Sequence, residues 1–153
     1  MDNFLESERW MKDAEDSLSR ARRCFKENDW RGTIQSAQLA IELSVKAIIA
    51  LFEEPDWTHN PGKQLKTIIQ NMEEKLKKRF PDAFLEEVLG CAEDAEFSAP
   101  WHGWSVYGKE GGNGRWVPAV ELCNRTVACD LLERAERTFM TARRFLEIFT
   151  SRK

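Results

Sequence analysis

Apolar residues recur every three to four positions over five long stretches of this chain, the spacing of one face of an α-helix. The pattern predicts helices at residues 7–27, 30–53, 63–80, 81–95 and 118–150. No stretch alternates at period two, so no strand competes with this interpretation. We therefore expect an all-α fold, an up-and-down bundle of four to five helices with short connections.

The second predicted helix differs from the others. Asn28-Asp29 breaks the chain before it, with Asp29 suited to cap it, and its second half, residues 39–52, is apolar on almost every face. A helix of that kind lies at the centre of a fold. Glu42 and Lys46 nevertheless stand inside it, four residues apart, where opposite charges can pair. We favour an ion pair that fixes helix or dimer register; a polar site that meets a ligand is the alternative.

Residues 96–116, EFSAPWHGWSVYGKEGGNGRW, show no helical period and hold four glycines in GKEGGNG. We expect a long Gly- and aromatic-rich loop at about 96–117. It is not a phosphate-binding loop, since the Walker pattern ends in Gly-Lys-Ser/Thr after a strand. Its aromatic residues can stack on bases or fill a partner's groove. We favour their folding back onto the bundle as a minor core, because exposed aromatic side chains promote aggregation. These residues are Trp101, Trp104, Tyr107 and Trp116.

Length and composition narrow the class of protein. With 153 residues, the chain fits one domain, residues 1–153. Its net charge of −3 gives no general attraction to nucleic acid or anionic lipid, so such binding needs a local basic patch. The longest apolar stretch, residues 39–52, is shorter than the roughly 20 residues that cross a membrane. Residues 1–20 are polar, so we expect a cytoplasmic protein with no signal peptide and no membrane contact.

Metal and cofactor motifs are missing from the sequence. The four cysteines have no CxxC spacing, and we expect free thiols that are buried or partly buried. A di-iron carboxylate bundle needs Glu-x-x-His motifs, and the chain has none. We therefore predict no metal site and no cofactor. The cysteines are Cys24, Cys91, Cys123 and Cys129.

The order of features resembles the HEPN superfamily of helical-bundle domains, over residues 7–70 above all. The segment SAQLAIELSVKAII, residues 36–49, is similar to the family's second helix, and His59 falls where many members have a histidine before helix three. The remaining matching residues are Trp10, Ala14, Asp16, Asn28-Asp29-Trp30, and Gln38, Ala40, Glu42, Lys46 and Ala47 within the second helix.

The resemblance implies a helical bundle that commonly dimerises, so a homodimer is expected. Family members include RNA-cleaving toxins, modules paired with small nucleotidyltransferases in toxin–antitoxin-like contexts, and nucleotide- or RNA-binding appendages. A nucleotide, an RNA or a separately encoded nucleotidyltransferase is thus the expected partner.

The resemblance also indicates which catalytic motif of the family this chain lacks. Family ribonucleases carry an Arg followed after four to six residues by a His, which together supply a base and a phosphate-binding cation. No Arg precedes His59 or His102 at that spacing. Arg125 is followed at that spacing by Asp130, and an ionised Asp is a poor proton donor. We therefore predict a non-catalytic module. A divergent ribonuclease using His59 or His102 and a structural protein-interaction bundle are the alternatives.

The sequence assigns no catalytic residue. We expect His59 to cap or hydrogen-bond the helix at residues 63–80, with ligand binding as its alternative role. The candidate ligand-binding residues are Glu42, Lys46, His59, Arg125, Trp101, Trp104 and Tyr107.

Overall fold

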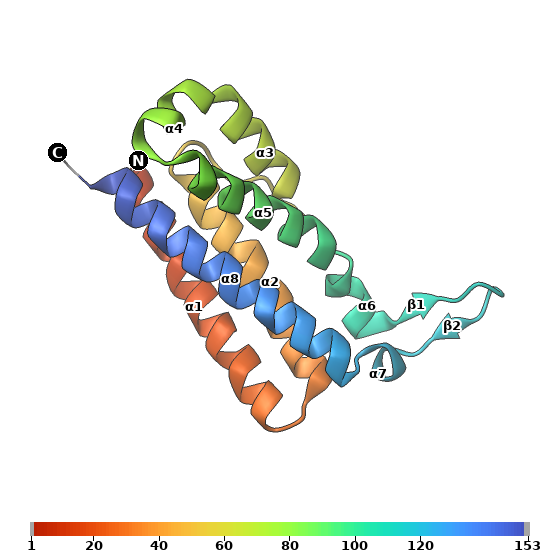
Figure 1. Cartoon of the computed structure of the whole chain (residues 1–153). Helices are drawn as coiled ribbons and strands as arrows, with labels where there is room; N and C mark the ends of the chain where they lie inside the picture. The colour runs from red at the N-terminus through yellow and green to blue at the C-terminus, as the bar shows by residue number, and fades with distance from the viewer. Residues whose placement is uncertain (1, 152–153) are drawn as a thin grey trace.

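The computed structural model describes residues 2–151 and is built almost entirely of helices, as the all-α expectation requires. Long helices run side by side along one direction, and a short hairpin projects from one end (Figure 1). The elements are α1 (Asn3–Lys26), α2 (Trp30–Ala50), α3 (Gly62–Asn71), α4 (Glu73–Arg79), α5 (Asp82–Ser98), α6 (Trp101–Tyr107), β1 (Lys109–Glu110), β2 (Trp116–Val117), α7 (Ala119–Leu122) and α8 (Arg125–Thr150).

Helix α2 is the central element, as its apolar pattern predicts. It contacts α1, α8, α5, α6 and α3, and most of its side chains are buried. Ile34, Ile41 and Ile48 are fully enclosed, and each contributes about 1.5–3 kcal/mol relative to exposure. The position of α2 means that any polar side chain on it either finds a partner inside the bundle or faces an opening in it.

Two aspartates begin the first two helices. The Asp2 carboxylate accepts hydrogen bonds from the amides of Phe4 and Leu5, and Asp29 accepts one from Gly32 at 2.9 Å. This confirms Asp29 as the N-cap of α2, where it satisfies an amide that the helix leaves free. Asn28 adopts a positive φ of 61° in the joint between α1 and α2, a conformation that asparagine tolerates.

Two predicted helices are each divided in the structure. The predicted helix at residues 63–80 is α3 followed by α4, with the break at Met72. The predicted helix at residues 118–150 is α7 followed by α8, because the Asn124 side chain accepts a hydrogen bond from the amide of Val127 and starts a new helix there. The apolar period continues across both breaks, so it conceals them.

The loop expected at about 96–117 was predicted wrongly over most of its length. Helix α5 extends to Ser98, and Pro100 precedes the two turns of α6. Seven residues are too few for a period to be recognised. Gly108 ends α6 with φ 85°, and a Cβ there would collide with the Val117 carbonyl oxygen of the facing strand. Strands β1 and β2 then pair antiparallel. As a result, His102 lies on a helix that packs against α2.

Within residues 2–151, no helix combines the length and the apolar character that crossing a membrane would require.

Candidate functional site

Glu42 of α2 is a buried carboxylate with three side-chain partners. Its side chain is only 6% exposed. Lys46 donates to Oε2 at 3.2 Å, and Gln38 donates to Oε1 at 3.1 Å, each from one turn away on α2. His59 Nδ1 approaches Oε1 at 3.2 Å. The predicted Glu42–Lys46 ion pair is thus confirmed, and it belongs to a larger polar cluster.

The cluster extends from Glu42 to a second histidine. A carboxylate only accepts hydrogen bonds, so Gln38 presents its amide N–H to Glu42 and its carbonyl oxygen to His102 Nδ1, 3.2 Å away. By the same logic His59 donates Nδ1–H to Glu42. Each neutral ring then keeps its lone pair on Nε2. The rings of His59 and His102 are stacked, with centroids 3.6 Å apart and planes 18° from parallel.

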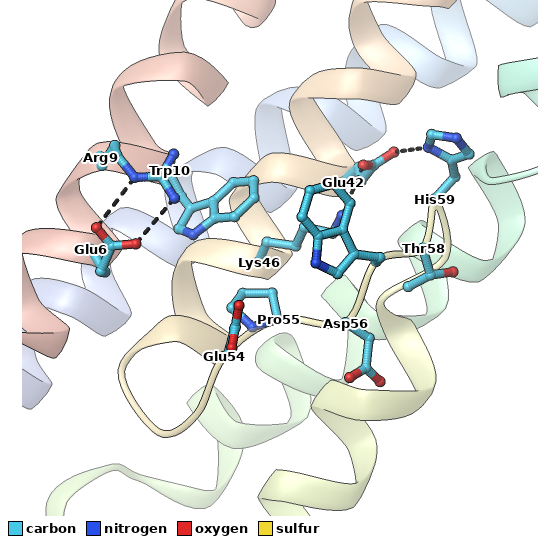
Figure 2. A pocket seen from close by; sticks show the side chains of 11 residues that line it. Glu6, Arg9, Trp10, Glu42, Lys46, Glu54, Pro55, Asp56, Thr58 and His59 are labelled. Atoms are coloured by element: carbon cyan, nitrogen blue, oxygen red, sulfur yellow. Dashed lines mark hydrogen bonds and ion pairs between the residues drawn. The ribbon is translucent and has the colours of Figure 1, made fainter. Parts of the chain in front are cut away.

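A pocket of about 570 Å³ opens beside this cluster, between α1, α2 and the α2–α3 loop, residues 51–61. In Figure 2, Glu42 and His59 lie along one side and the Glu6–Arg9 pair lies opposite. The volume falls within the range of pockets that hold small ligands. The lining residues are Glu6, Arg9, Trp10, Glu42, Lys46, Glu54, Pro55, Asp56, Trp57, Thr58 and His59.

Two tryptophans give the pocket its aromatic character. The Trp10 ring has the Arg9 guanidinium 4.7 Å and the Lys46 ammonium 5.6 Å from its centroid, distances suited to cation–π attraction. Trp57 is 99% exposed and yet lines the pocket, so its ring makes almost no contact with the rest of the protein. An exposed tryptophan at a pocket is available to a ligand.

Side chains of α3 and of the loop itself hold the α2–α3 loop in place. Pro55 follows the end of α2, and the Gln64 side chain then accepts from the Asp56 amide at 2.9 Å and donates to the Glu54 carbonyl at 3.0 Å. Thr58 Oγ1 accepts from the Asn60 amide at 3.1 Å. These bonds position the segment that carries Trp57 and His59. His59 therefore contacts Glu42 of α2, and the expectation that it caps or bonds the helix after the loop was wrong.

Most of the residues that line the pocket lie in the part of the chain that matches a known protein family. The HEPN domain family matches residues 7–96. The chain belongs to the HEPN family. The matched residues include Trp10, Glu42, Lys46 and His59, whereas His102 lies beyond them. No curated protein matches the chain.

A solved structure is similar in fold to this HEPN protein. The crystal structure of TT1696 from Thermus thermophilus superposes with a TM-score of 0.65 and 16% sequence identity. The match covers 90% of this chain and 96% of that one. At this identity the likeness concerns the arrangement of helices.

The HEPN bundle brings together only some of the residues that the sequence singled out. Glu42, Lys46 and His59 meet at the pocket. Arg125 lies elsewhere, with its guanidinium 5.7 Å from the Phe25 ring centroid and 5.9 Å from that of Trp30 at the other end of α2.

The aromatic residues near α6 behave in two ways. Trp101 packs against the core and meets Trp104 edge to face, 5.3 Å between centroids. Tyr107 and Trp116 remain exposed, so the prediction that all four fold back was wrong for these two. None of the four lines the pocket beside Glu42.

Sequence reasoning missed several residues of the site. Trp10 is a matching residue of the family resemblance, and the sequence did not predict that this partly buried side chain lines a pocket. Trp57 stands among proline and asparagine in a loop, an unusual place for a large apolar side chain, and this signal was available. The Gln38–Glu42 contact has the same four-residue spacing as Glu42–Lys46, and this signal was available. The contact between Gln38 and His102 had no signal, since it depends on the packing of α6 against α2.

A second buried carboxylate, Asp94 of α5, is fully paired. Its side chain is 4% exposed. Arg134 and Arg137 of α8 each donate to Oδ1 at 2.9 Å, and the Thr138 hydroxyl donates to Oδ2 at 3.1 Å. The hydrogen bond from Arg137 to Asp94 raises the pKa of that guanidinium. Burial raises the pKa of the neighbouring Cys91 thiol to about 12.

Proposed function

We propose that this HEPN module binds a mononucleotide, or one nucleotide of an RNA, in the pocket between α1, α2 and the α2–α3 loop. The observation that carries the proposal is the exposed Trp57 ring on the same pocket as two cations, Arg9 and Lys46. A nucleotide offers a flat base and a charged phosphate, and the pocket offers a partner for each.

Trp57 is the side chain on which the base would stack. Stacking of a base on an aromatic side chain contributes about 1–3 kcal/mol and tolerates any base, because every base has a π face. Trp57 has its ring open for this contact, whereas the Trp10 ring already lies close to Arg9 and Lys46. Trp57 is therefore the stacking platform and Trp10 is a wall of the pocket.

The charges limit the size of the ligand. Four carboxylates line the pocket beside the two cations, and Arg9 and Lys46 are already paired with Glu6 and Glu42. A phosphate must compete with those partners for Arg9 and Lys46 at the pocket edge. A long polyphosphate or an RNA duplex would meet net negative charge. This supports a mononucleotide or one unstacked nucleotide.

The test is titration of the full chain with each of the four ribonucleoside monophosphates, by calorimetry and by thermal shift. Trp57→Ala should weaken binding about tenfold, as expected for the loss of one stacking contact. Trp116→Ala is the matched control, because that tryptophan is also exposed but lies on β2. Equal affinity in the two variants would contradict the assigned pocket.

A divergent ribonuclease is the second candidate, favoured by the stacking of His59 on His102 above a buried carboxylate. Two imidazoles with one carboxylate provide the groups of general acid–base catalysis. Single-stranded RNA incubated with the full chain should then be cleaved, and His59→Ala and His102→Ala should each abolish cleavage. Cleavage that survives both substitutions would come from a contaminant.

At the level of assembly, we propose a homodimer that pairs with a separately encoded nucleotidyltransferase, in a toxin–antitoxin-like context, as the family suggests. Light scattering after gel filtration measures the subunit number. A monomer at micromolar concentration would refute the dimer. The interaction-bundle alternative would use the exposed Tyr107 and Trp116, and replacing both with serine should change the assembly only in that case.

A further inference from the structure

Three potential metal ligands converge where three separate segments meet. Glu42 comes from α2, His59 from the α2–α3 loop and His102 from α6. One ligand atom of each lies within 4.8 Å of the other two. We propose that this set, the Glu-His-His cluster, binds a single divalent transition-metal ion, with zinc as the expected ion. The proposal does not depend on nucleotide binding.

The spacing of the first two ligands already suits an ion. Zinc bonds to carboxylate oxygen and imidazole nitrogen are about 2.0–2.2 Å long, so two ligands at a tetrahedral angle stand about 3.3 Å apart. Glu42 Oε1 and His59 Nδ1 are 3.2 Å apart. An ion can therefore take the place of the proton between them. His59 then carries its one proton on Nε2, and the ring stays neutral.

The third ligand needs a small movement. His102 is exposed, and the His59 side chain is 59% exposed, so both rings can turn out of their stacked arrangement without disturbing the core. Ligand atoms 4.8 Å apart need a shift of about 1.5 Å to reach the tetrahedral spacing, and a turn of the His102 ring presents Nε2 to the ion. Gln38 accepts the Nδ1–H of His102 and leaves Nε2 free to coordinate. Ligand histidines are commonly oriented by such a bond.

The neighbours of Glu42 set its mode of binding. Lys46 donates a hydrogen bond to Oε2 at 3.2 Å, so only Oε1 is available as a ligand for the ion. Gln38 supports Oε1 from one turn away. The Lys46 ammonium opposes a second cation close by, whereas Glu54 and Asp56 line the same pocket and offset it. We therefore expect micromolar rather than nanomolar affinity.

The donor types select the ion. Two imidazole nitrogens and one carboxylate oxygen suit zinc and other borderline metals, whereas magnesium and calcium favour all-oxygen sets. Three protein ligands also leave one coordination position open. Glu42 and His59 belong to both the cluster and the pocket, so that position would face the pocket edge.

The experiment uses the full chain, without a histidine tag and stripped with a chelator. Zinc chloride is titrated in competition with a chromogenic chelator, and magnesium chloride is the comparison. Cobalt(II) chloride provides a spectroscopic readout, since its visible absorption reports four-coordinate nitrogen and oxygen ligands. We expect one zinc per chain and no competition from magnesium.

The variants separate this site from others. His102→Ala and His59→Ala should each weaken zinc binding about tenfold or more and remove the cobalt absorption. Glu74→Gln, which removes an exposed carboxylate of α4 outside the cluster and the pocket, should leave both unchanged. Both histidines are exposed, so the variants should keep the metal-free melting temperature of the parent protein.

Absence of zinc binding, or binding that both histidine variants retain, would overturn the proposal. A thiolate-to-cobalt band in the near ultraviolet would assign the ion to the cysteines and would also overturn it. If the two histidine variants lose zinc binding and keep the nucleotide affinity of the parent protein, the metal site is supported and the nucleotide proposal stays intact.

Discussion

Glu42 and Asp94 are both buried carboxylates on central helices, and their surroundings differ. Asp94 is held by two guanidinium groups and a hydroxyl, all from α8, so both of its oxygens are occupied. Glu42 is held by an ammonium, an amide and an exposed imidazole, and it borders a pocket.

The difference teaches that burial of a charge does not by itself mark a functional site. At Asp94 five hydrogen bonds from three side chains of α8 occupy both oxygens, so the site is closed to a ligand. This is typical of a structural network that joins α5 to α8. At Glu42 one partner can turn away and a ligand can reach the carboxylate. A buried carboxylate can bind a ligand when the ligand can replace one of its hydrogen-bond partners.

The largest expected effect is at the closed site. Asp94→Ala should lower the free energy of unfolding by about 3 kcal/mol, because it leaves two arginines without their shared carboxylate. Both guanidinium groups are partly exposed and can regain water, which keeps the loss at the low end of the range for buried pairs. Urea denaturation measures it. A loss below about 1 kcal/mol would show that the network is not structural.

Cys91, beside Asp94, should make the same region sensitive to alkali. Its pKa is raised to about 12 in the folded protein, above the value of 9.0 for an ordinary thiol. Between pH 9 and 12 the unfolded chain therefore loses this proton first, and stability falls; below pH 9 the thiol has no effect. At pH 10 the loss is about 1.4 kcal/mol. The readout is the difference in urea stability between the parent and Cys91→Ala at pH 8 and pH 10, since the variant removes only this contribution. If the difference in stability were the same at pH 8 and pH 10, the Cys91 thiol would not be buried as the structure shows.

A smaller effect is expected at the open site. Glu42→Gln should cost about 1 kcal/mol, because glutamine still accepts hydrogen bonds and Lys46 borders the pocket. Asp94→Asn is the matched substitution and should cost more, as measured by the same urea denaturation. If Glu42→Gln proved the more destabilising of the two, the distinction between open and closed sites would fail.

The smallest effect is expected at the pocket rim. Trp57→Ala should change the free energy of unfolding by less than about 0.5 kcal/mol, since the ring is almost fully exposed. Together with the expected loss of nucleotide affinity, this would separate binding from folding. A marked destabilisation would instead show that Trp57 packs against the protein in solution.

Much of the fold is predictable from local pattern, and less of the site is. The apolar period correctly predicts α1, α2, α5 and α8, with errors at breaks such as Met72 and Asn124 where the period runs on. The helix α6 was missed because two turns are too short to show a period. Asp94 drew no attention, since its arginine partners lie on α8, far along the chain.

By itself the sequence determined the helical bundle, the central position of α2 and the Glu42–Lys46 pair, because helical period and four-residue spacing act within one element. Only the tertiary structure decided that His59 reaches Glu42, that His102 reaches Gln38, and that Trp10 and Trp57 share a pocket. Those contacts join residues from different helices and a loop. They depend on how α6 and the α2–α3 loop pack against α2, for which a one-dimensional pattern carries no signal.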